Sequence, residues 1–368
     1  MRIAYDYQAF SQKHGGVSLY YSRLASALDN IGESVRIFTP FYQSSALSQL
    51  GDHLVFGRHL DKYPNGSKRL LRAMNEIVAP FPMAVWRPDI VHRTYYSSPV
   101  IKVPAKVNII TVYDMIHELL PSSFRKEDTT SKNKRSMIED ADHVICISNK
   151  TREDLHSILN ISREKTSCIY LGVDQIAPFK EGGDIKKYLG NSSKPYILYV
   201  GARTSYKNFD NFLKAFAISN LMHDFNIIVA GGGGFTDRDI QLIDQLKFDS
   251  GQITQIECGI QTLNLLYSSA SALIYPSLYE GFGLPPLEAM QMGCPVISSN
   301  GGSMPEVIGQ AAEFFDPHSI EEMSHAMERV VYFPQRVAEL RQLGSGVAKK
   351  YTWSSCAENT LRTYKKLL

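Results

Sequence analysis

Short apolar runs recur along the chain, and stretches with apolar residues near every 3.6 positions separate them. The runs are of the kind that form buried parallel strands. They cover residues 2–7, 34–39, 88–92, 107–112, 142–148, 166–171, 196–200, 226–230, 253–255, 272–274 and 295–299. Because helical patterns fall between these strands, the sequence predicts βαβ units and parallel sheets.

The alternation of strands and helices occurs twice, on either side of a polar segment at residues 175–194 that contains glycine and is only weakly periodic. Such a segment is typical of a linker. We therefore predict an α/β protein with two Rossmann-like domains, at residues 1–174 and 195–350. A helix over residues 354–368 closes the chain, and residues 351–368 form the C-terminal segment.

Composition fits this organisation, since 368 residues with 44% hydrophobic and 21% charged content suit about two globular domains. A net charge of +2 by itself argues neither for nor against a nucleic-acid partner, and we expect none. Five scattered cysteines without a CxxC pair favour reduced thiols and a cytoplasmic location. We also expect no signal peptide and no membrane span, because no apolar run approaches the necessary ~20 residues.

The most informative stretch runs from residue 275 to residue 290, where a strand leads through a loop into a short helix. Glu280 lies in the loop, and we expect Glu288 in the first turn of the helix, where the helix dipole would stabilise its carboxylate. Gly283 and Leu284 offer backbone amides just before two prolines. In an open α/β sheet, ligands bind at this edge, and helix amides suit an anion.

Two further loops carry residues suited to a phosphate-bearing ligand. Arg203 and Lys207 follow the strand at 196–200, where a guanidinium fork and an ammonium could both meet phosphate oxygens. Gly15 and Gly16 form a turn after the first strand, either as a plain tight turn or to allow close approach of a ligand. The strand at 107–112 ends in polar groups that include Asp114 and His117.

Several other chemistries lack support in the sequence. The Asp-x-Asp patterns at 237–239 and 140–142 read as helix-capping and turn residues rather than metal ligands. We see no cluster with metal-ligand spacing and no GxxxxGK[ST] loop, and the glycine run at 231–234 is not GxGxxG. We therefore expect no metal and no other cofactor.

The stretch from Glu280 to Met290 resembles the Glu-x7-Glu signature of family 4 retaining glycosyltransferases, which have the GT-B fold. Other matching pieces occur in family order and extend the resemblance over nearly the whole chain. They are residues 15–17, Asp114, 147–155, 172–174, Arg203 with Lys207, and 302–307. The fold then implies two domains facing a central cleft, with the C-terminal helix packing back on the first.

This resemblance also implies roles for individual residues. Glu288 would hold the donor ribose, Arg203 and Lys207 the diphosphate, and Glu280 the transferred sugar. Gly283 and Leu284 would add backbone amides, and Gly16 would let the first domain approach the diphosphate. Asp114 belongs to the catalytic set. Many members have a histidine where Tyr113 stands, so either Tyr113 or His117 takes its place here.

The implied activity is a metal-independent, retaining transfer of a hexose from a nucleoside-diphosphate sugar to a glycan or lipid-linked acceptor. The Pro-Pro form of the signature and residues 303–306 resemble bacterial polysaccharide mannosyltransferases, which favours GDP-mannose or a related GDP-deoxyhexose as the donor. A UDP-hexose is the alternative donor. A GT-B epimerase or phosphorylase, and a non-catalytic binding subunit, are rival functions.

The acceptor is expected in the N-terminal half. Basic segments at 68–72, 123–126 and 132–135, the first of which leads into apolar residues 77–82, suit a lipid-linked acceptor at an anionic membrane surface. Their alternative interpretation is as solvated faces. The sequence thus predicts a cytoplasmic protein that can associate peripherally with the inner face of the cytoplasmic membrane.

Overall fold

The computed structural model describes residues 1–11, 15–64, 66–97, 102–175, 185 and 194–368. The chain forms two compact units. Unit 1 contains Met1–Leu119, Phe124–Gly172 and Thr352–Leu368, and unit 2 contains Leu120–Ser123 and Val173–Tyr351. Val173 and Asp174, expected in the first domain, thus belong to unit 2, and most of the expected linker at 175–194 lies outside the described residues.

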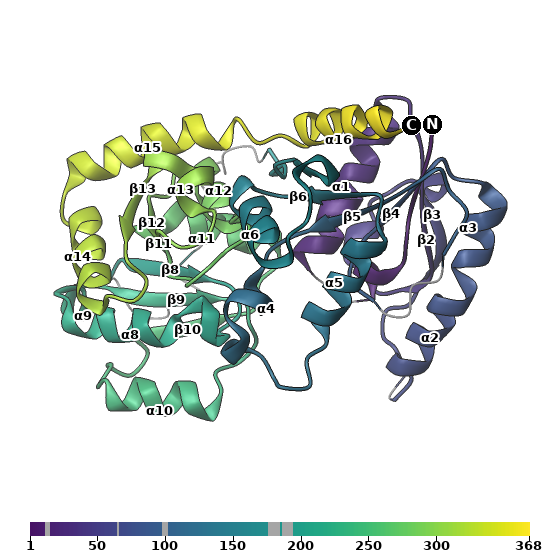
Figure 1. Cartoon of the computed structure of the whole chain (residues 1–368). Helices are drawn as coiled ribbons and strands as arrows, with labels where there is room; N and C mark the ends of the chain where they lie inside the picture. The colour runs from purple at the N-terminus through teal and green to yellow at the C-terminus, as the bar shows by residue number, and fades with distance from the viewer. Residues whose placement is uncertain (12–14, 65, 98–101, 176–184, 186–193) are drawn as a thin grey trace. The chain divides into compact units, whose positions relative to one another are not determined.

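Unit 1 is built on a seven-stranded sheet in the order β3-β2-β1-β4-β5-β6-β7, and its described strands pair in parallel (Figure 1). Its strands are β1 Arg2–Tyr5, β2 Ser34–Tyr42, β3 Val55–His59, β4 Ile90–Arg93, β5 Val107–Val112, β6 His143–Cys146 and β7 Thr166–Cys168. Its helices are α1 Gly16–Asn30, α2 Lys68–Val78, α3 Pro80–Trp86, α4 Ile116–Leu119, α5 Thr130–Asp140, α6 Asn149–Leu159 and α16 Trp353–Leu367.

Unit 2 repeats this plan with a six-stranded parallel sheet in the order β10-β9-β8-β11-β12-β13. Its strands are β8 Tyr196–Val200, β9 Asn226–Ala230, β10 Ile253–Ile256, β11 Ala272–Tyr275, β12 Val296–Ser299 and β13 Ala312–Phe315. Its helices are α8 Phe209–Ile218, α9 Leu221–Asp224, α10 Asp237–Gln245, α11 Ile260–Ser269, α12 Leu284–Gln291, α13 Met304–Ile308, α14 Ile320–Val331 and α15 Pro334–Ala348.

The predicted α/β class and the two parallel sheets are confirmed, but two edge strands were missed. Strand β3 has the sequence Val-Phe-Gly-Arg-His and is largely exposed, so it lacks the apolar run that marks a buried strand. Strand β13 has only four residues, and only its first and last, Ala312 and Phe315, are buried. Edge strands need only one paired neighbour, and their sequences are correspondingly less apolar.

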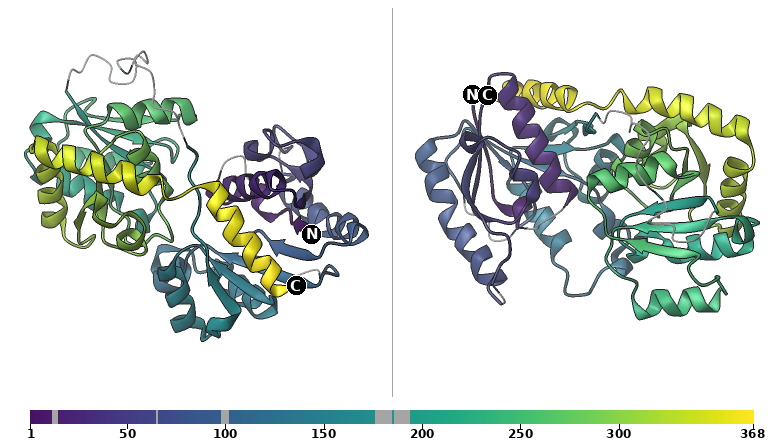
Figure 2. Two further views of the ribbon diagram at one scale, coloured as in Figure 1. Left: turned by 90° about the horizontal axis from the view of Figure 1, so that it is seen from above. Right: turned by 180° about the vertical axis from the view of Figure 1, so that it is seen from behind.

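The C-terminal helix α16 belongs to unit 1 and packs beside α1 (Figures 1 and 2). Its buried face contains Cys356, Ala357 and Tyr364. The Tyr364 hydroxyl lies 2.6 Å from His92 Nδ1 in the core of the sheet. Burial lowers the pKa of His92 to about 3, so the imidazole is neutral and can hydrogen bond without a buried charge.

Each sheet has one point at which the order of its strands reverses direction. In unit 1 this switch point lies between β1 and β4, and in unit 2 it lies between β8 and β11. Loops that leave the carboxyl ends of such neighbouring strands diverge and leave a crevice for ligands. The fold therefore directs attention to the loops after β1, β4, β8 and β11.

Within the described residues, none of the helices has the length and apolar character needed to cross a membrane.

Candidate functional site

At the switch point of unit 2, an ion pair joins the loops that follow β8 and β11. Lys207 Nζ donates to Glu280 Oε1 over 2.5 Å, and the two side chains are only 18% and 11% exposed. The ammonium also lies 5.5 Å from the ring centroid of Tyr275 at the end of β11. Two of the predicted site residues thus meet where the fold leaves room for a ligand.

The backbone at Glu280 is held by the segment that follows β12. Ser303 donates from its amide and from its hydroxyl to the carbonyl of Glu280, over 3.0 and 3.1 Å. Gly302 has φ +62°, and a Cβ there would lie 2.4 Å from the Glu280 carbonyl oxygen. Only glycine allows this close approach. The segment at 301–303 therefore fixes the backbone position of the loop that carries Glu280.

We expect Gly302→Ala to destabilise unit 2 by about 2–4 kcal/mol and to impair the site, because the new methyl displaces the backbone of Glu280. Gly293→Ala is the matched control, since Gly293 has φ +71° but open space around its Cβ position. It carries the same backbone strain, about 1–2 kcal/mol, without the collision. Urea unfolding of both variants measures the difference, and equal losses would contradict this role of Gly302.

Helix α12 begins at the other end of the loop. Gly283 is its N-cap, with φ +94°, and a Cβ there would lie 2.5 Å from Met304 Cε. Leu284 keeps its N–H at the first helical position, whereas Pro285 and Pro286 have none. The helix start therefore presents few amide donors, and they are grouped at Gly283 and Leu284, as the sequence predicts.

The position predicted for Glu288 in the first turn is wrong. Helix α12 starts at Leu284, so Glu288 is its fifth residue and the first turn has no acid. The helix dipole acts only within the first turn, so it does not explain this carboxylate. Instead, the Tyr267 hydroxyl donates to Glu288 Oε2 over 3.0 Å. Burial raises the pKa of Glu288, and the Tyr267 hydrogen bond opposes that rise only in part.

Arg203 is tied to the glycine run at 231–234 that follows β9. Its guanidinium donates to the Gly233 carbonyl over 2.9 Å and pairs through Nε with Asp239 Oδ2 over 3.2 Å, and the side chain is 5% exposed. Asp239 also forms a capping box with Thr236 at the start of α10. The predicted capping role of this Asp-x-Asp pattern is confirmed, and the sequence did not reveal that Asp239 also orients Arg203.

The candidate residues of unit 1 follow β1 and β5. Gly16 opens α1, and a Cβ there would meet no atom within 4 Å, so packing of the described residues does not require a glycine. Tyr113 is 9% exposed, and its hydroxyl donates to the Thr94 carbonyl over 2.7 Å. Asp114 accepts from the Ile116 amide over 3.0 Å at the start of α4.

His117 lies in α4 with its ring stacked on Phe124, and the ring centroids are 3.8 Å apart. Burial and the Lys134 charge lower the pKa of this histidine against the opposing effect of nearby carboxylates. The imidazole is therefore neutral at pH 7 and can accept as well as donate a hydrogen bond. Tyr113 is the more deeply buried of the two candidates for the family histidine.

The interpretation of residues 132–135 as a solvated basic surface is wrong for Lys134. Its side chain is 0% exposed, with Nζ 2.7 Å from Glu118 Oε2 and 2.9 Å from the Asp114 carbonyl. Lys134 shares the buried face of α5 with Met137 and Ile138, at spacings of three and four residues. This spacing is the sequence signal that could have shown Lys134 to be buried. Lys134 thus fixes the loop of Asp114 from within unit 1.

Among the residues that the structure describes, no group of three or more His, Cys, Asp or Glu side chains could hold a metal ion. The Asp-x-Asp pattern at 140–142 lies at the end of α5, as predicted, with Asp142 accepting from the Asn108 amide over 2.7 Å.

Two parallel-sheet units and a carboxylate, lysine and amide site at a switch point define a protein of the GT-B class. Two family models cover most of the chain: "Glycosyltransferase Family 4" matches residues 14–175 and "Glycosyl transferases group 1" matches residues 183–343. The chain belongs to glycosyltransferase family 4.

Curated relatives include O-antigen chain mannosyltransferase B of Escherichia coli, which is 33% identical over 47% of this chain and 46% of its own length. O-antigen chain mannosyltransferase RfbU of Salmonella typhimurium is 28% identical over 62% of each chain. The matches thus span about half to three fifths of these relatives. Among solved structures, sucrose-phosphate synthase from Thermosynechococcus elongatus has the same fold, with a TM-score of 0.78 at 19% identity, covering 100% of this chain and 98% of that one.

Proposed function

We propose that this chain is a glycosyltransferase that moves a hexose from a nucleoside-diphosphate sugar to a glycan or lipid-linked acceptor, with retention of configuration and without a metal ion. The observation that carries the proposal is the Lys207–Glu280 ion pair beside the start of α12. It provides a cation, a carboxylate and backbone amides at one switch point. A sugar diphosphate requires these groups together, because it combines an anion with hydroxyls.

In this mechanism the bond between the sugar C1 and the diphosphate oxygen breaks, and an acceptor hydroxyl oxygen forms the new bond to C1 on the same face. The acceptor proton passes to the leaving diphosphate. Negative charge builds on that diphosphate, and Lys207, Arg203 and the amides of Gly283 and Leu284 stabilise it. Glu280 orients the sugar hydroxyls, and Glu288 holds the ribose.

Unit 1 supplies the acceptor side in this proposal. Asp114 lies in the loop after β5 and His117 in the helix α4 that follows it, and Lys134 anchors this loop at the Asp114 carbonyl. Gly16 gives the diphosphate close access to the start of α1. Since the ring of Tyr113 is buried and its hydroxyl is engaged by Thr94, we assign the role of the family histidine to His117.

The donor we propose is GDP-mannose or a related GDP-deoxyhexose, and the product belongs to a bacterial surface polysaccharide such as an O-antigen. The names of the mannosyltransferase relatives support this choice. A UDP-hexose remains the alternative donor. The protein would act in the cytoplasm.

The experiment is a panel of labelled GDP- and UDP-sugars with nucleotide release as the readout, in the presence and absence of oligosaccharide acceptors. A hexosyltransferase releases nucleotide faster when an acceptor is added. An epimerase converts the sugar nucleotide without an acceptor, and a phosphorylase consumes phosphate and oligosaccharide. A binding subunit releases no nucleotide. The result expected for an epimerase, a phosphorylase or a binding subunit would overturn the proposal.

We further propose that unit 1 contacts an anionic membrane through α2 and α3. These helices run on through Ala79, whose dihedral angles are helical. Exposed apolar side chains recur along them every seven or four positions, at Leu70, Ile77, Phe81 and Val85, and they are 62–75% exposed. Exposed Arg69 and Arg87 lie towards the two ends of this stripe. Apolar residues beside cations favour the interface of an anionic bilayer.

We expect the double variant Phe81→Ser/Val85→Ser to bind vesicles of phosphatidylglycerol and phosphatidylcholine at least about tenfold more weakly, since each buried apolar side chain contributes roughly 1.5–3 kcal/mol. Co-sedimentation measures the change. The matched control is Ile218→Ser/Phe333→Ser, which removes two exposed apolar residues from unit 2. Equal losses in the two double variants, or none in the first, would contradict docking through α3.

A further inference from the structure

The switch point of unit 1 holds a cleft that none of the individually predicted site residues lines, although Arg72 and Asn133 come from the basic segments at 68–72 and 132–135. Its volume is about 720 Å³ including the open space at its mouth. The lining comes from the loops after β1 and β4 and from helices α2 and α5, and includes Tyr7, Gln8, Arg72, Tyr95, Thr130 and Asn133. It therefore occupies in unit 1 the place that the Lys207–Glu280 pair occupies in unit 2.

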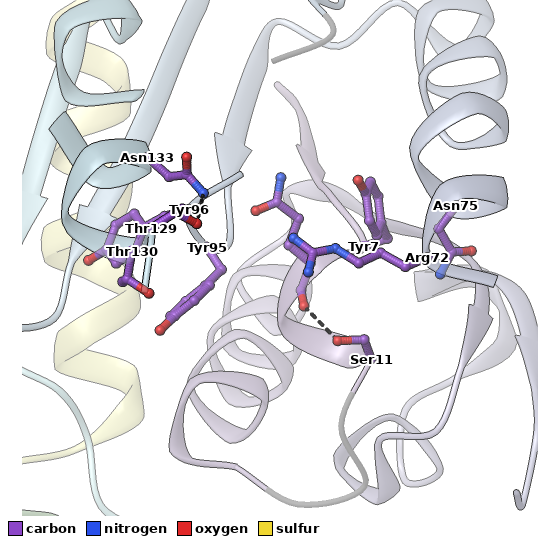
Figure 3. A pocket seen from close by; sticks show the side chains of 10 residues that line it. Tyr7, Ser11, Arg72, Asn75, Tyr95, Tyr96, Thr129, Thr130 and Asn133 are labelled. Carbon is purple, nitrogen blue, oxygen red and sulfur yellow. Dashed lines mark hydrogen bonds between the residues drawn. The ribbon is translucent and has the colours of Figure 1, made fainter. Parts of the chain in front are cut away.

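The cleft combines aromatic faces with amide, hydroxyl and guanidinium groups. Figure 3 shows Tyr95 and Asn133 on one side and Tyr7 and Arg72 on the other, with the Arg72 guanidinium extending between them. Arg72 is exposed and makes no hydrogen bond or ion pair with any described residue. Because Arg72 turns into this cleft, it is separate from the apolar stripe of α2 and α3.

One hydrogen-bond acceptor in this cleft, the side-chain oxygen of Gln8, has no partner among the described residues. The Gln8 side-chain amide donates to Ser97 Oγ, while Gln8 Oε1 is buried and has no hydrogen-bond partner among the described residues. A buried acceptor without a partner is costly unless a ligand or water satisfies it. The lining residues include one cation and no acid, so the cleft suits a neutral or anionic ligand rather than a cation.

The walls of the cleft are fixed within unit 1. Thr94 links the two loops, because its amide donates to Asp6 Oδ1 over 2.9 Å and its hydroxyl accepts from the Ala9 amide over 3.0 Å. On the α2 side, the Asn75 side chain accepts from and donates to the backbone of Phe41, both over 2.8 Å. A ligand thus meets a preformed site, which lowers the ordering cost of binding.

We propose that this cleft binds one pyranose residue of the acceptor glycan. An apolar sugar face packs on the Tyr95 ring, while ring hydroxyls donate to Gln8 Oε1 and accept from Asn133 and Arg72. Aromatic platforms with a few convergent polar groups are the chemistry that fixes such an amphipathic ring in place. The assignment rests on the proposed glycosyltransferase function and names the acceptor site within it.

The test uses the full-length protein and a soluble probe, an α-linked mannotriose, so that membrane association plays no part. Saturation-transfer NMR measures binding of the mannotriose, and GDP-mannose hydrolysis without acceptor measures the donor site independently. The variants are Tyr95→Ala, Asn133→Ala and Arg72→Ala. Tyr95→Phe retains the ring, and Arg163→Ala removes an exposed cation that precedes β7, the edge strand three positions from β4 in the sheet.

We expect the three alanine variants to weaken mannotriose binding and to raise its KM in transfer by about tenfold or more, equivalent to ~1.4 kcal/mol each. Tyr95→Phe and Arg163→Ala keep wild-type binding, and all variants keep donor hydrolysis. Wild-type mannotriose binding in all three alanine variants, or its absence in the wild-type protein with donor hydrolysis intact, would overturn the acceptor site alone. If the wild-type protein neither binds nor hydrolyses GDP-mannose or a UDP-hexose, the proposed function is overturned instead.

Discussion

Lys207→Ala is expected to lower the turnover number for sugar transfer by about 10²–10³-fold, the usual loss when one group that stabilises a developing charge is removed. Lys207 is the cation at the switch point of unit 2. Its Nζ lies 2.5 Å from Glu280 Oε1, and this ion pair holds the ammonium in place. Without it, charge on the departing diphosphate meets fewer compensating groups. Steady-state kinetics with saturating donor measures the change, and near-normal turnover would refute the assignment.

Removal of Lys207 also leaves the carboxylate of Glu280, whose side chain is only 11% exposed, without its cation. Some loss of stability is therefore expected, at roughly 1–3 kcal/mol. The double variant Lys207→Met/Glu280→Gln separates the two effects because it removes both charges. We expect its free energy of unfolding to recover towards that of the wild type while its turnover stays low. Arg238→Ala, which removes a cation 79% exposed in the same unit, is the control for net charge.

Glu288→Gln is expected to reduce kcat/KM for the donor by about 10²-fold or more, because a neutral amide is a weaker acceptor for the two ribose hydroxyls. The same substitution is expected to stabilise the ligand-free protein at neutral pH. Burial raises the pKa of Glu288 above its ordinary value of 4.5, so the ionised side chain is disfavoured in the folded state.

The sign of this pH dependence follows from linkage. A folded-state pKa above the unfolded one favours folding at low pH, and that contribution disappears as pH rises through the folded pKa. Glutamine cannot ionise, so Glu288→Gln should raise the midpoint of thermal unfolding at pH 8 and lose this advantage as the pH approaches 4.5. Tyr267 can donate to either side chain, which makes the comparison well matched. A lower midpoint of thermal unfolding for Glu288→Gln than for the wild type at pH 8 would contradict the claim that burial disfavours the ionised Glu288 side chain.

The sequence predicted the sheets and the loops of the site because both have local signals. Apolar runs mark the buried strands, and the combination of Glu280, Gly283 and Glu288 lies in one continuous stretch. Lys207 and Glu280 lie 73 residues apart, and only the family resemblance assigned both to one ligand. Their ion pair depends on the pairing of β8 with β11, which no local pattern revealed.

Features that depend on long-range packing escaped prediction. Its spacing from Met137 and Ile138 indicates that Lys134 is buried, but nothing local reveals that Glu118 lies beside it. Two other features likewise join segments that are distant in sequence. They are the close approach of Gly302 to the Glu280 backbone and the ion pair between Asp239 and Arg203. The cleft at the switch point of unit 1 draws its lining from four separate segments, so no single stretch carried its signature.

The place of α16 has a consequence for synthesis of the protein. Residues 173–351 of unit 2 leave the ribosome before residues 353–367, whereas the core of unit 1 includes Tyr364, hydrogen bonded to His92 across 272 positions of sequence. The face of α1 that α16 covers therefore has no partner helix until residues 353–367 have been made. Although domains generally fold in the order of their synthesis, unit 1 receives its last helix only after residues 173–351 of unit 2 have been made.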